Sequence, residues 1–274
     1  MIDAHVHLWE LARRQDAWPG PELPVLHRDF GLDDLRAALA GSGVRQVLLI
    51  QSEPSEADTR WLLQMAGDPI VAGVVGWTDL AAADAPARID SLAAAGPLVG
   101  IRPMVQDLAD EWYDDVALDV AFAHLAHRGL VLDALVRPRH LASLARLAAR
   151  HPGLSIVIDH AAKPATGGDT VRWAEDMRAL AALPNVMCKL SGLLTEIDRS
   201  THADAVPRLI ADLLTMFGLD RLIWGSDWPV VTMRTSYTDW LAQARDAIPS
   251  DRHTDVFARN AARTYRIPVM ADAA

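Results

Sequence analysis

Eight short runs rich in Val, Ile and Leu recur along the chain. They lie at residues 2–9, 44–52, 71–79, 98–105, 130–137, 155–163, 186–193 and 222–228. The runs are nearly continuous in apolar residues, whereas a strand with one face in water would alternate apolar and polar side chains. The pattern therefore predicts eight strands buried on both faces, as in a parallel sheet.

The stretches between these runs have the spacing of amphipathic helices, and several end on Gly or Pro, which are common helix stop signals. Strand followed by helix, repeated eight times in 274 residues, predicts an α/β fold of the (β/α)8 TIM-barrel type. The alternative is a doubly wound open sheet. It would have about six or fewer strands and a Gly-rich phosphate-binding turn after the first strand, and neither is present.

No change in composition and no Ser/Gly-rich linker marks a second domain, so we assign residues 1–274 to one barrel domain. Residues 10–31 are rich in proline and lack periodicity, which predicts a long loop over the barrel mouth. Residues 251–267 predict a final helix packed outside the barrel.

The charge balance narrows the possible partners. The sequence has 36 acidic against 26 basic residues, a formal net charge of -10 and no stripe of Lys and Arg, so neither nucleic acid nor an anionic membrane is an expected partner. No apolar run reaches the roughly 18 residues of a membrane span. The single cysteine, Cys188, cannot form an internal disulfide, which suits a reducing cytoplasm. We expect a cytoplasmic protein that binds a small molecule, and a homo-oligomer remains open.

Polar side chains stand where several of the predicted strands end, which is where a TIM barrel carries its chemistry. They are His5 and His7 on the first strand, Arg102 on the fourth, Asp159, His160 and Lys163 on the sixth, and Asp227 on the eighth. Residues two apart on a strand point to the same side, so both imidazoles of the first strand can face the mouth.

Each of these residues alone has a structural explanation. A His-x-His pair can be incidental, Asp227 could cap a helix, and Arg102 or Lys163 could serve an ion pair or a solvated turn. Their joint occurrence on four strands predicts one binding site, because charged groups rarely gather at one rim of a barrel without a ligand.

Four tryptophans fall near strand ends or in the loops that follow: Trp9, Trp77, Trp112 and Trp228. An indole face can pack on the C–H groups of a sugar ring while its N–H reaches a hydroxyl group. Core packing is the alternative for each of them. Residues 106–115, after the fourth strand, are a candidate specificity lid.

Six segments resemble the amidohydrolase superfamily, and within it the amidohydrolase 2 branch that holds sugar-acid lactonases of the L-fuconolactonase and L-rhamnonolactonase type. They are DAHVHLW at 3–9, GIRPMVQD at 100–107, LDALVRPRHL at 132–141, IDHAAKP at 158–164, CKLSGLLTE at 188–196 and WGSDWPV at 224–230. Two of these segments, IDHAAKP and WGSDWPV, are the most specific, and the resemblance spans the chain.

The resemblance implies hydrolysis of an aldono-lactone. Asp227 matches the aspartate that takes the proton from the attacking water, and His5, His7 and His160 would face the lactone carbonyl. Arg102, Lys163, Trp9, Trp112 and Trp228 are the expected substrate-binding residues. Alternatives are a metal-dependent decarboxylase or another mononuclear zinc hydrolase of the same superfamily, and a non-catalytic scaffold.

The resemblance is incomplete at the metal site. Binuclear members use a carboxylated Lys or a Glu on strand four or five and a His on strand five, whereas this chain offers Arg102 and a fifth strand without His. The donors that remain, His5, His7, Asp227 and His160, could hold one Zn²⁺. We expect a site without metal, with one divalent ion as the alternative.

Overall fold

The computed structural model describes residues 1–164, 170–196 and 205–268. Its eight strands form one parallel sheet in which each strand pairs with the next along the chain. They are β1 Ile2–Val6, β2 Gln46–Ile50, β3 Val71–Gly76, β4 Leu98–Ile101, β5 Val131–Ala134, β6 Ile156–Ile158, β7 Val186–Leu190 and β8 Leu222–Trp224. The sheet closes beyond the strand ends, where the N–H of His7 donates to the Trp228 carbonyl at 2.8 Å. The predicted TIM barrel is confirmed.

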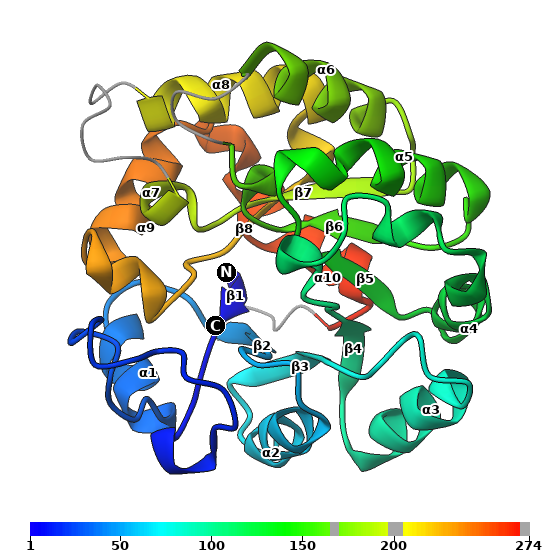
Figure 1. The fold of residues 1–274 in the computed structure, drawn as a ribbon. Coiled ribbons are helices and arrows are strands. Elements are labelled where there is room, and N and C mark those ends of the chain that lie inside the picture. The colour runs from blue at the N-terminus through cyan, green and yellow to red at the C-terminus, as the bar shows by residue number, and fades with distance from the viewer. Residues whose placement is uncertain (165–169, 197–204, 269–274) are drawn as a thin grey trace.

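Helices surround the strands, as Figure 1 shows in a view down the barrel. They are α1 Leu32–Leu39, α2 Glu56–Met65, α3 Ala85–Ala95, α4 Asp119–Arg128, α5 Leu141–Arg150, α6 Thr170–Ala181, α7 Leu193–Glu196, α8 Ala205–Phe217, α9 Tyr237–Asp246 and α10 Asn260–Tyr265. The outward-facing strand residues pack with the apolar faces of these helices in one large cluster. None of the helices in the described part of the chain is both long and apolar enough to cross a bilayer.

The strands are shorter than the apolar runs in the sequence. β6 stops at Ile158 and β8 at Trp224, so the polar residues that follow lie in turns and not in the strands themselves. The length of an apolar run does not reveal where its backbone leaves the sheet, because residues of the following turn are also buried.

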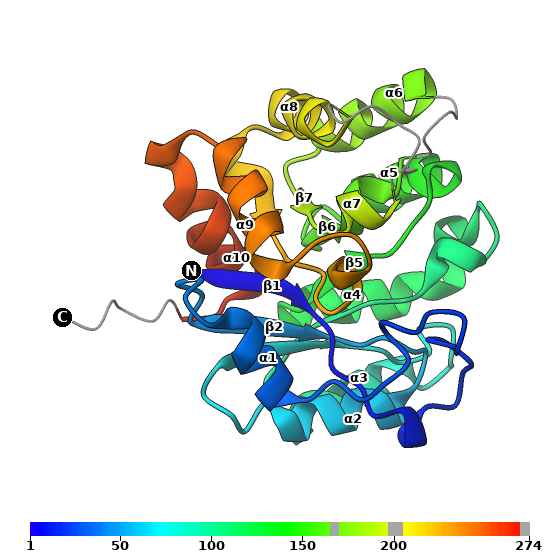
Figure 2. The ribbon, with the colours of Figure 1, turned by 90° about the vertical axis from the view of Figure 1, so that its left-hand side faces the viewer.

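The closing helix lies at the end of the barrel where β1 begins, opposite the mouth (Figure 2). Residues of α10 and its two flanks join the inward-facing strand residues in a second apolar cluster: Ala258, Ala261, Ala262, Tyr265 and Ile267. The helix is therefore outside the strand wall, as expected, but it also plugs the bottom of the barrel. The extension of the domain to residue 274 stays a prediction, since residues 269–274 lie outside the described part.

Candidate active site

A bulge in β1 aims the first histidine into the barrel. Asp3 pairs with Val47 and Val6 pairs with Leu49, so a step of three residues on β1 faces a step of two on β2. One extra residue in a strand reverses the face on which the following side chains lie. His5 thus points into the barrel, whereas Asp3 points out of it, and the side chain of His5 is fully buried.

Asp227 follows β8 in a left-handed backbone conformation, with φ of 59°. Its N–H donates to the carbonyl of His5 at 2.9 Å, and Trp228 pairs with the first strand next to it. The segment therefore crosses over to β1 and brings the carboxylate to the two imidazoles. A left-handed residue other than Gly costs about 1–2 kcal/mol, so tertiary contacts must hold this turn.

His160 also begins an unusual turn after β6. Four consecutive residues without a Gly, 160 to 163, have φ between 50° and 60°. The indole N–H of Trp173 donates to the carbonyl of Ala161 at 3.0 Å, which satisfies a buried backbone group of the turn. The Ser191 hydroxyl contacts Nδ1 of His160 at 2.9 Å and directs Nε2 of the ring toward Asp227.

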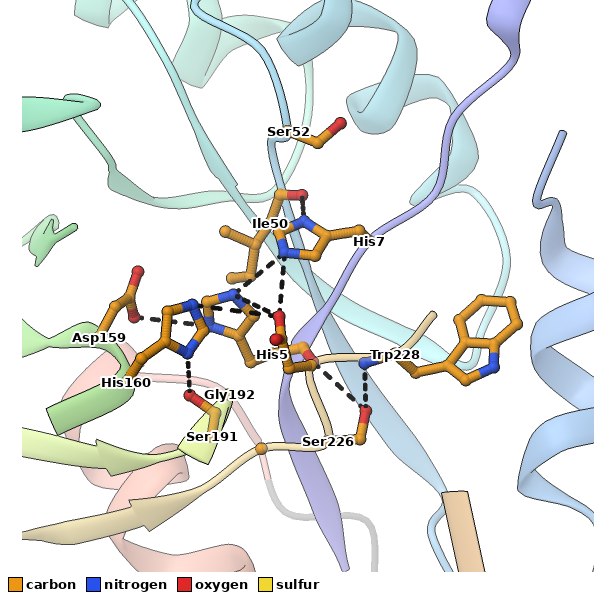
Figure 3. Close-up of polar contacts among 12 residues, drawn as sticks. His5, His7, Ile50, Ser52, Asp159, His160, Ser191, Gly192, Ser226 and Trp228 are labelled. Carbon is orange, nitrogen blue, oxygen red and sulfur yellow. Dashed lines mark hydrogen bonds and ion pairs between the residues drawn. The ribbon is translucent and has the colours of Figure 1, made fainter. Parts of the chain in front are cut away.

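The three imidazoles lie close together (Figure 3), and the carboxylate of Asp227 lies within 4.0 Å of each of them. Nε2 of His5 lies 3.2 Å from Nε2 of His7, and Oδ1 of Asp227 lies 3.4 Å from Nε2 of His7. The same oxygen lies 3.7 Å from Nε2 of His5 and 4.0 Å from Nε2 of His160. All four side chains are almost completely buried, at the mouth end of the barrel.

Burial and charge set the protonation of this cluster. Burial lowers the pKa of His5 and His7 below the usual value, so both rings are neutral near pH 7. Burial alone would raise the pKa of Asp227, but His160, His7 and His5 together hold it well below the usual range. The site therefore presents an ionised carboxylate beside the neutral rings of His5 and His7.

These donors fit one divalent ion. In a tetrahedral zinc site with ligands at roughly 2.0–2.1 Å, neighbouring ligand atoms lie about 3.3 Å apart. His5, His7 and Asp227 place three ligand atoms at 3.2, 3.4 and 3.7 Å from one another. The carbonyl of Ile50 binds Nδ1 of His7 at 2.8 Å, which leaves Nε2 as the ligand atom. The site without metal that the sequence led us to expect is therefore not confirmed.

A second group of possible ligands, His5, Asp159 and His160, is less suited to an ion. Oδ1 of Asp159 lies 3.1 Å from the ammonium of Lys189, and Oδ2 lies 3.4 Å from the guanidinium of Arg102. Although burial alone would raise the pKa of Asp159, Lys189 and other neighbours hold it well below the usual range. The carboxylate of Asp159 is therefore already paired with two protein cations, Lys189 and Arg102.

The two predicted cationic substrate-binding residues are near the cluster, and both have protein partners. Arg102 is buried and donates through Nη2 to the carbonyl of Gln51, in addition to its contact with Asp159. Nζ of Lys163 forms an ion pair with Oε1 of Glu196 at 2.7 Å, which joins the turn after β6 to the neighbouring helix α7. A substrate would compete with Glu196 for Lys163.

The three predicted aromatic contacts pack in the large apolar cluster, and the indole of Trp228 points away from the imidazoles (Figure 3). Trp9 is buried, donates to the Arg28 carbonyl at 2.8 Å and lines a cavity of about 250 Å³. Trp228 packs edge-on against Phe30, and Trp112 against Tyr113 and Phe122. Their roles toward a substrate stay predictions.

The candidate lid is fixed to α5. Ser143 donates to the carbonyl of Asp110 at 2.7 Å, and Arg146 pairs with Asp114 at 2.6 Å. The segment 106–115 is thus held against α5, and its role as a specificity lid stays a prediction.

Sequence reasoning missed a buried charge network beneath the cluster. Nζ of Lys189 on β7 lies 2.5 Å from Oδ2 of Asp133 on β5 and 3.3 Å from Nδ1 of His5. Tyr265 of α10 donates to Oδ1 of Asp133 at 2.7 Å. The signal was present, because a Lys and an Asp each interrupt an apolar run, and charges in strands buried on both faces must pair.

The chain is similar to known lactonases and amidohydrolases over nearly its whole length. An L-fucono-1,5-lactonase of Burkholderia ambifaria is 46% identical over 276 aligned positions, which cover 97% of this chain and 95% of that protein. An L-fucono-1,5-lactonase of Burkholderia multivorans is 34% identical, with 99% and 98% covered. The crystal structure of an amidohydrolase from Burkholderia multivorans with bound zinc superposes with a TM-score of 0.87 at 34% identity, covering 97% of this chain and 99% of that one. The sequence model of the family described as Amidohydrolase matches residues 2–267, and this chain belongs to that family.

Proposed function

We propose that this protein hydrolyses the lactone of a sugar acid, with a 1,5-lactone of the L-fucono type as the first candidate substrate. The observation that carries the proposal is the convergence of His5, His7, His160 and Asp227 at the mouth of the barrel. The two relatives named as L-fucono-1,5-lactonases, at 46% and 34% identity over nearly the whole chain, support this choice of substrate class.

Asp227 is the general base in this proposal. Its ionised carboxylate accepts a proton from water as the water oxygen bonds to the lactone carbonyl carbon. The bond from that carbon to the ring oxygen then breaks, and the proton passes from Asp227 to the departing oxygen. The products are a hydroxyl group and a carboxylic acid, which ionises. General base action of this kind contributes about 10²–10⁴-fold to the rate.

The three imidazoles position the carboxylate of Asp227. His160, fixed by Ser191, faces the same oxygen of Asp227 as His5 and His7 and orients the carboxylate. We propose that His5, His7 and Asp227 hold one divalent ion, most simply Zn²⁺, with His160 beside it. When bound, the ion would supply Lewis-acid polarisation of the lactone carbonyl.

Arg102 and Lys163 are proposed to recognise the oxygen atoms of the substrate. Nε of Arg102 is buried and has no hydrogen-bond partner among the described residues, so it can donate to a substrate oxygen. Lys163 can exchange its bond to Glu196 for a bond to a substrate hydroxyl or carboxylate. Trp9, Trp112 and Trp228 would provide apolar surface around the ring.

The test is a panel of aldono-1,4- and 1,5-lactones with a pH indicator, because ring opening releases acid. The expected result is acid release above the spontaneous rate for at least one 1,5-lactone, including L-fucono-1,5-lactone. Parallel assays with added Zn²⁺ and with chelator show whether lactone hydrolysis requires an ion. Absence of acid release on every lactone, with and without Zn²⁺, would refute the proposal. Release of CO₂ from an aromatic acid would instead favour a decarboxylase.

A further inference from the structure

The proton of His7 has a defined position. Nδ1 of His7 lies 2.8 Å from the carbonyl oxygen of Ile50, which can only accept a hydrogen bond. Nδ1 therefore carries the proton of the neutral ring, and Nε2 carries a lone pair. This assignment holds whether or not an ion is bound.

His5 has two competing partners at its other nitrogen. Its Nδ1 lies 3.3 Å from the ammonium of Lys189, which can only donate, and 3.5 Å from Oδ1 of Asp159, which can only accept when ionised. The tautomer of His5 decides which of these contacts is a hydrogen bond.

One tautomer completes a chain of hydrogen bonds without an ion. If Nε2 of His5 carries the proton, it donates to the lone pair of His7 across the 3.2 Å contact. Nδ1 then accepts from Lys189, which is anchored by Asp133 at 2.5 Å. Every group in the chain has a partner of the right kind in this state.

An ion requires the other tautomer. Both Nε2 atoms must offer lone pairs to a metal, so the proton of His5 must sit on Nδ1. The acceptor there is Oδ1 of Asp159, a buried atom that lies 3.5 Å from Nδ1 of His5 and also 3.1 Å from the ammonium of Lys189. The N–H of His5 would then face the ammonium of Lys189, which opposes this state.

We propose that His5 is a tautomeric switch, in which Lys189 favours the hydrogen-bonded form closed to an ion and Asp159 favours the form that binds one. Lys189 and Asp159 are then positioning residues that act on the affinity of the site in opposite directions. The number of protons on His5 is the same in both forms, and only their place changes. The inference rests on the ion site proposed above and is independent of which lactone is turned over.

Nuclear magnetic resonance of the ring nitrogens tests the switch directly. The full chain, labelled with ¹⁵N-histidine, is compared after chelator treatment and after addition of Zn²⁺, and a His5→Gln variant identifies the His5 signals. We expect protonated Nε2 on His5 without the ion and protonated Nδ1 with it. His7 should keep its proton on Nδ1 in both states and serves as the internal control.

Zn²⁺ affinity, measured by competition with a chromophoric chelator, gives the second readout. Asp159→Asn should weaken Zn²⁺ binding by about 10- to 100-fold, the usual range for a residue that supports a metal-binding His. Lys189→Met is combined with Asp133→Asn so that Asp133 is not left as a buried charge without its cation, whereas Asp159 keeps its contact with Arg102. Asp133→Asn alone is the control. The double variant should bind Zn²⁺ on the order of 10-fold more tightly than the control.

Three results would overturn the inference. The first is the same His5 tautomer with and without Zn²⁺ in the wild-type protein. The second is a double variant that binds Zn²⁺ no more tightly than Asp133→Asn. The third is failure of the wild type to bind Zn²⁺ at all, which would also remove the ion from the proposed function but leave lactone hydrolysis to the panel assay.

Discussion

The carboxylate of Asp3 accepts a hydrogen bond from the backbone N–H of Ser226 at 2.8 Å. The same oxygen accepts from the N–H of His5 at 3.1 Å, and the other oxygen accepts from the hydroxyl of Tyr237 at 2.9 Å. One buried carboxylate thus ties the strand that carries the histidines to the turn that carries Asp227. It sets the geometry of the site although it lies on the outer face of β1.

Replacing Asp3 with Ala should therefore lower lactone turnover as well as stability. The substitution leaves two buried N–H groups without acceptors, which costs about 1–3 kcal/mol each before relaxation, and it loosens the turn at Asp227. Tyr237→Phe is the matched control, because it removes one bond of Asp3 and leaves both backbone bonds in place. Urea unfolding and the kcat and KM of lactone hydrolysis give the comparison. Equal losses of kcat in the two variants would argue against a positioning role for Asp3.

Asp227→Asn should reduce kcat by about 10²–10⁴-fold, since the amide cannot take a proton from water. The fold should survive, because the backbone bond from residue 227 to His5 does not involve the side chain. Asp33→Asn, at a fully exposed carboxylate, is the control. Circular dichroism and the lactone assay measure both properties, and a near-wild-type kcat in the Asp227→Asn variant would remove Asp227 from the role of base.

Gly192→Ala should displace His160. A Cβ at residue 192 would lie 2.4 Å from Nδ1 of His160, closer than real Cβ atoms approach such a group. Gly218→Ala is a close control, because both glycines are left-handed, with φ of 63° and 66°, but a Cβ at residue 218 meets nothing within 4 Å. Both variants should lose about 1 kcal/mol of stability through backbone strain, and only Gly192→Ala should lose lactone turnover. Similar turnover in the two proteins would contradict the orienting role of His160.

The strands and their order could be predicted from the sequence because burial on both faces leaves a strong local signal. The predicted strands also placed four polar residues near strand ends, and the structure brings them together: His5, His7, His160 and Asp227. What could not be predicted depends on backbone details without a local signal, such as the bulge in β1 and the left-handed turns at residues 160–163 and 227.

The network around Lys189 was missed for a different reason. Its members come from β5, the turn after β6, β7 and α10, and sequence patterns within one element say nothing about partners on another. The two interrupted apolar runs predict only that Lys189 and Asp133 each need an opposite charge. That they meet each other, beneath His5, is a property of the barrel.

Zn²⁺ should raise the thermal unfolding midpoint of chelator-treated protein. An ion that binds only the folded state stabilises it by about 2.7 kcal/mol at 100 times its dissociation constant. His7→Ala removes a ligand atom and should abolish the increment, whereas His127→Ala, at an exposed position, should keep it. Differential scanning fluorimetry over a Zn²⁺ titration measures the effect. An unchanged increment in His7→Ala would place the ion elsewhere on the protein.

Asp58 should make the protein less stable at alkaline pH. Burial, with the nearby Glu53 carboxylate, raises the pKa of Asp58 to about 6. Because this value lies above the usual one, the favourable contribution of the protonated group is complete below about pH 4 and is lost as the pH rises through about 6.

Asp58→Asn removes the buried charge and keeps an acceptor for the Ser52 N–H, which in the wild type donates to Oδ2 at 3.2 Å. We expect the variant to be about 1–3 kcal/mol more stable than wild type near pH 8 and no more stable near pH 4. Urea unfolding at both pH values tests this, with Asp33→Asn as the exposed control, and a stability gain that does not depend on pH would show that the charge of Asp58 is not its cause.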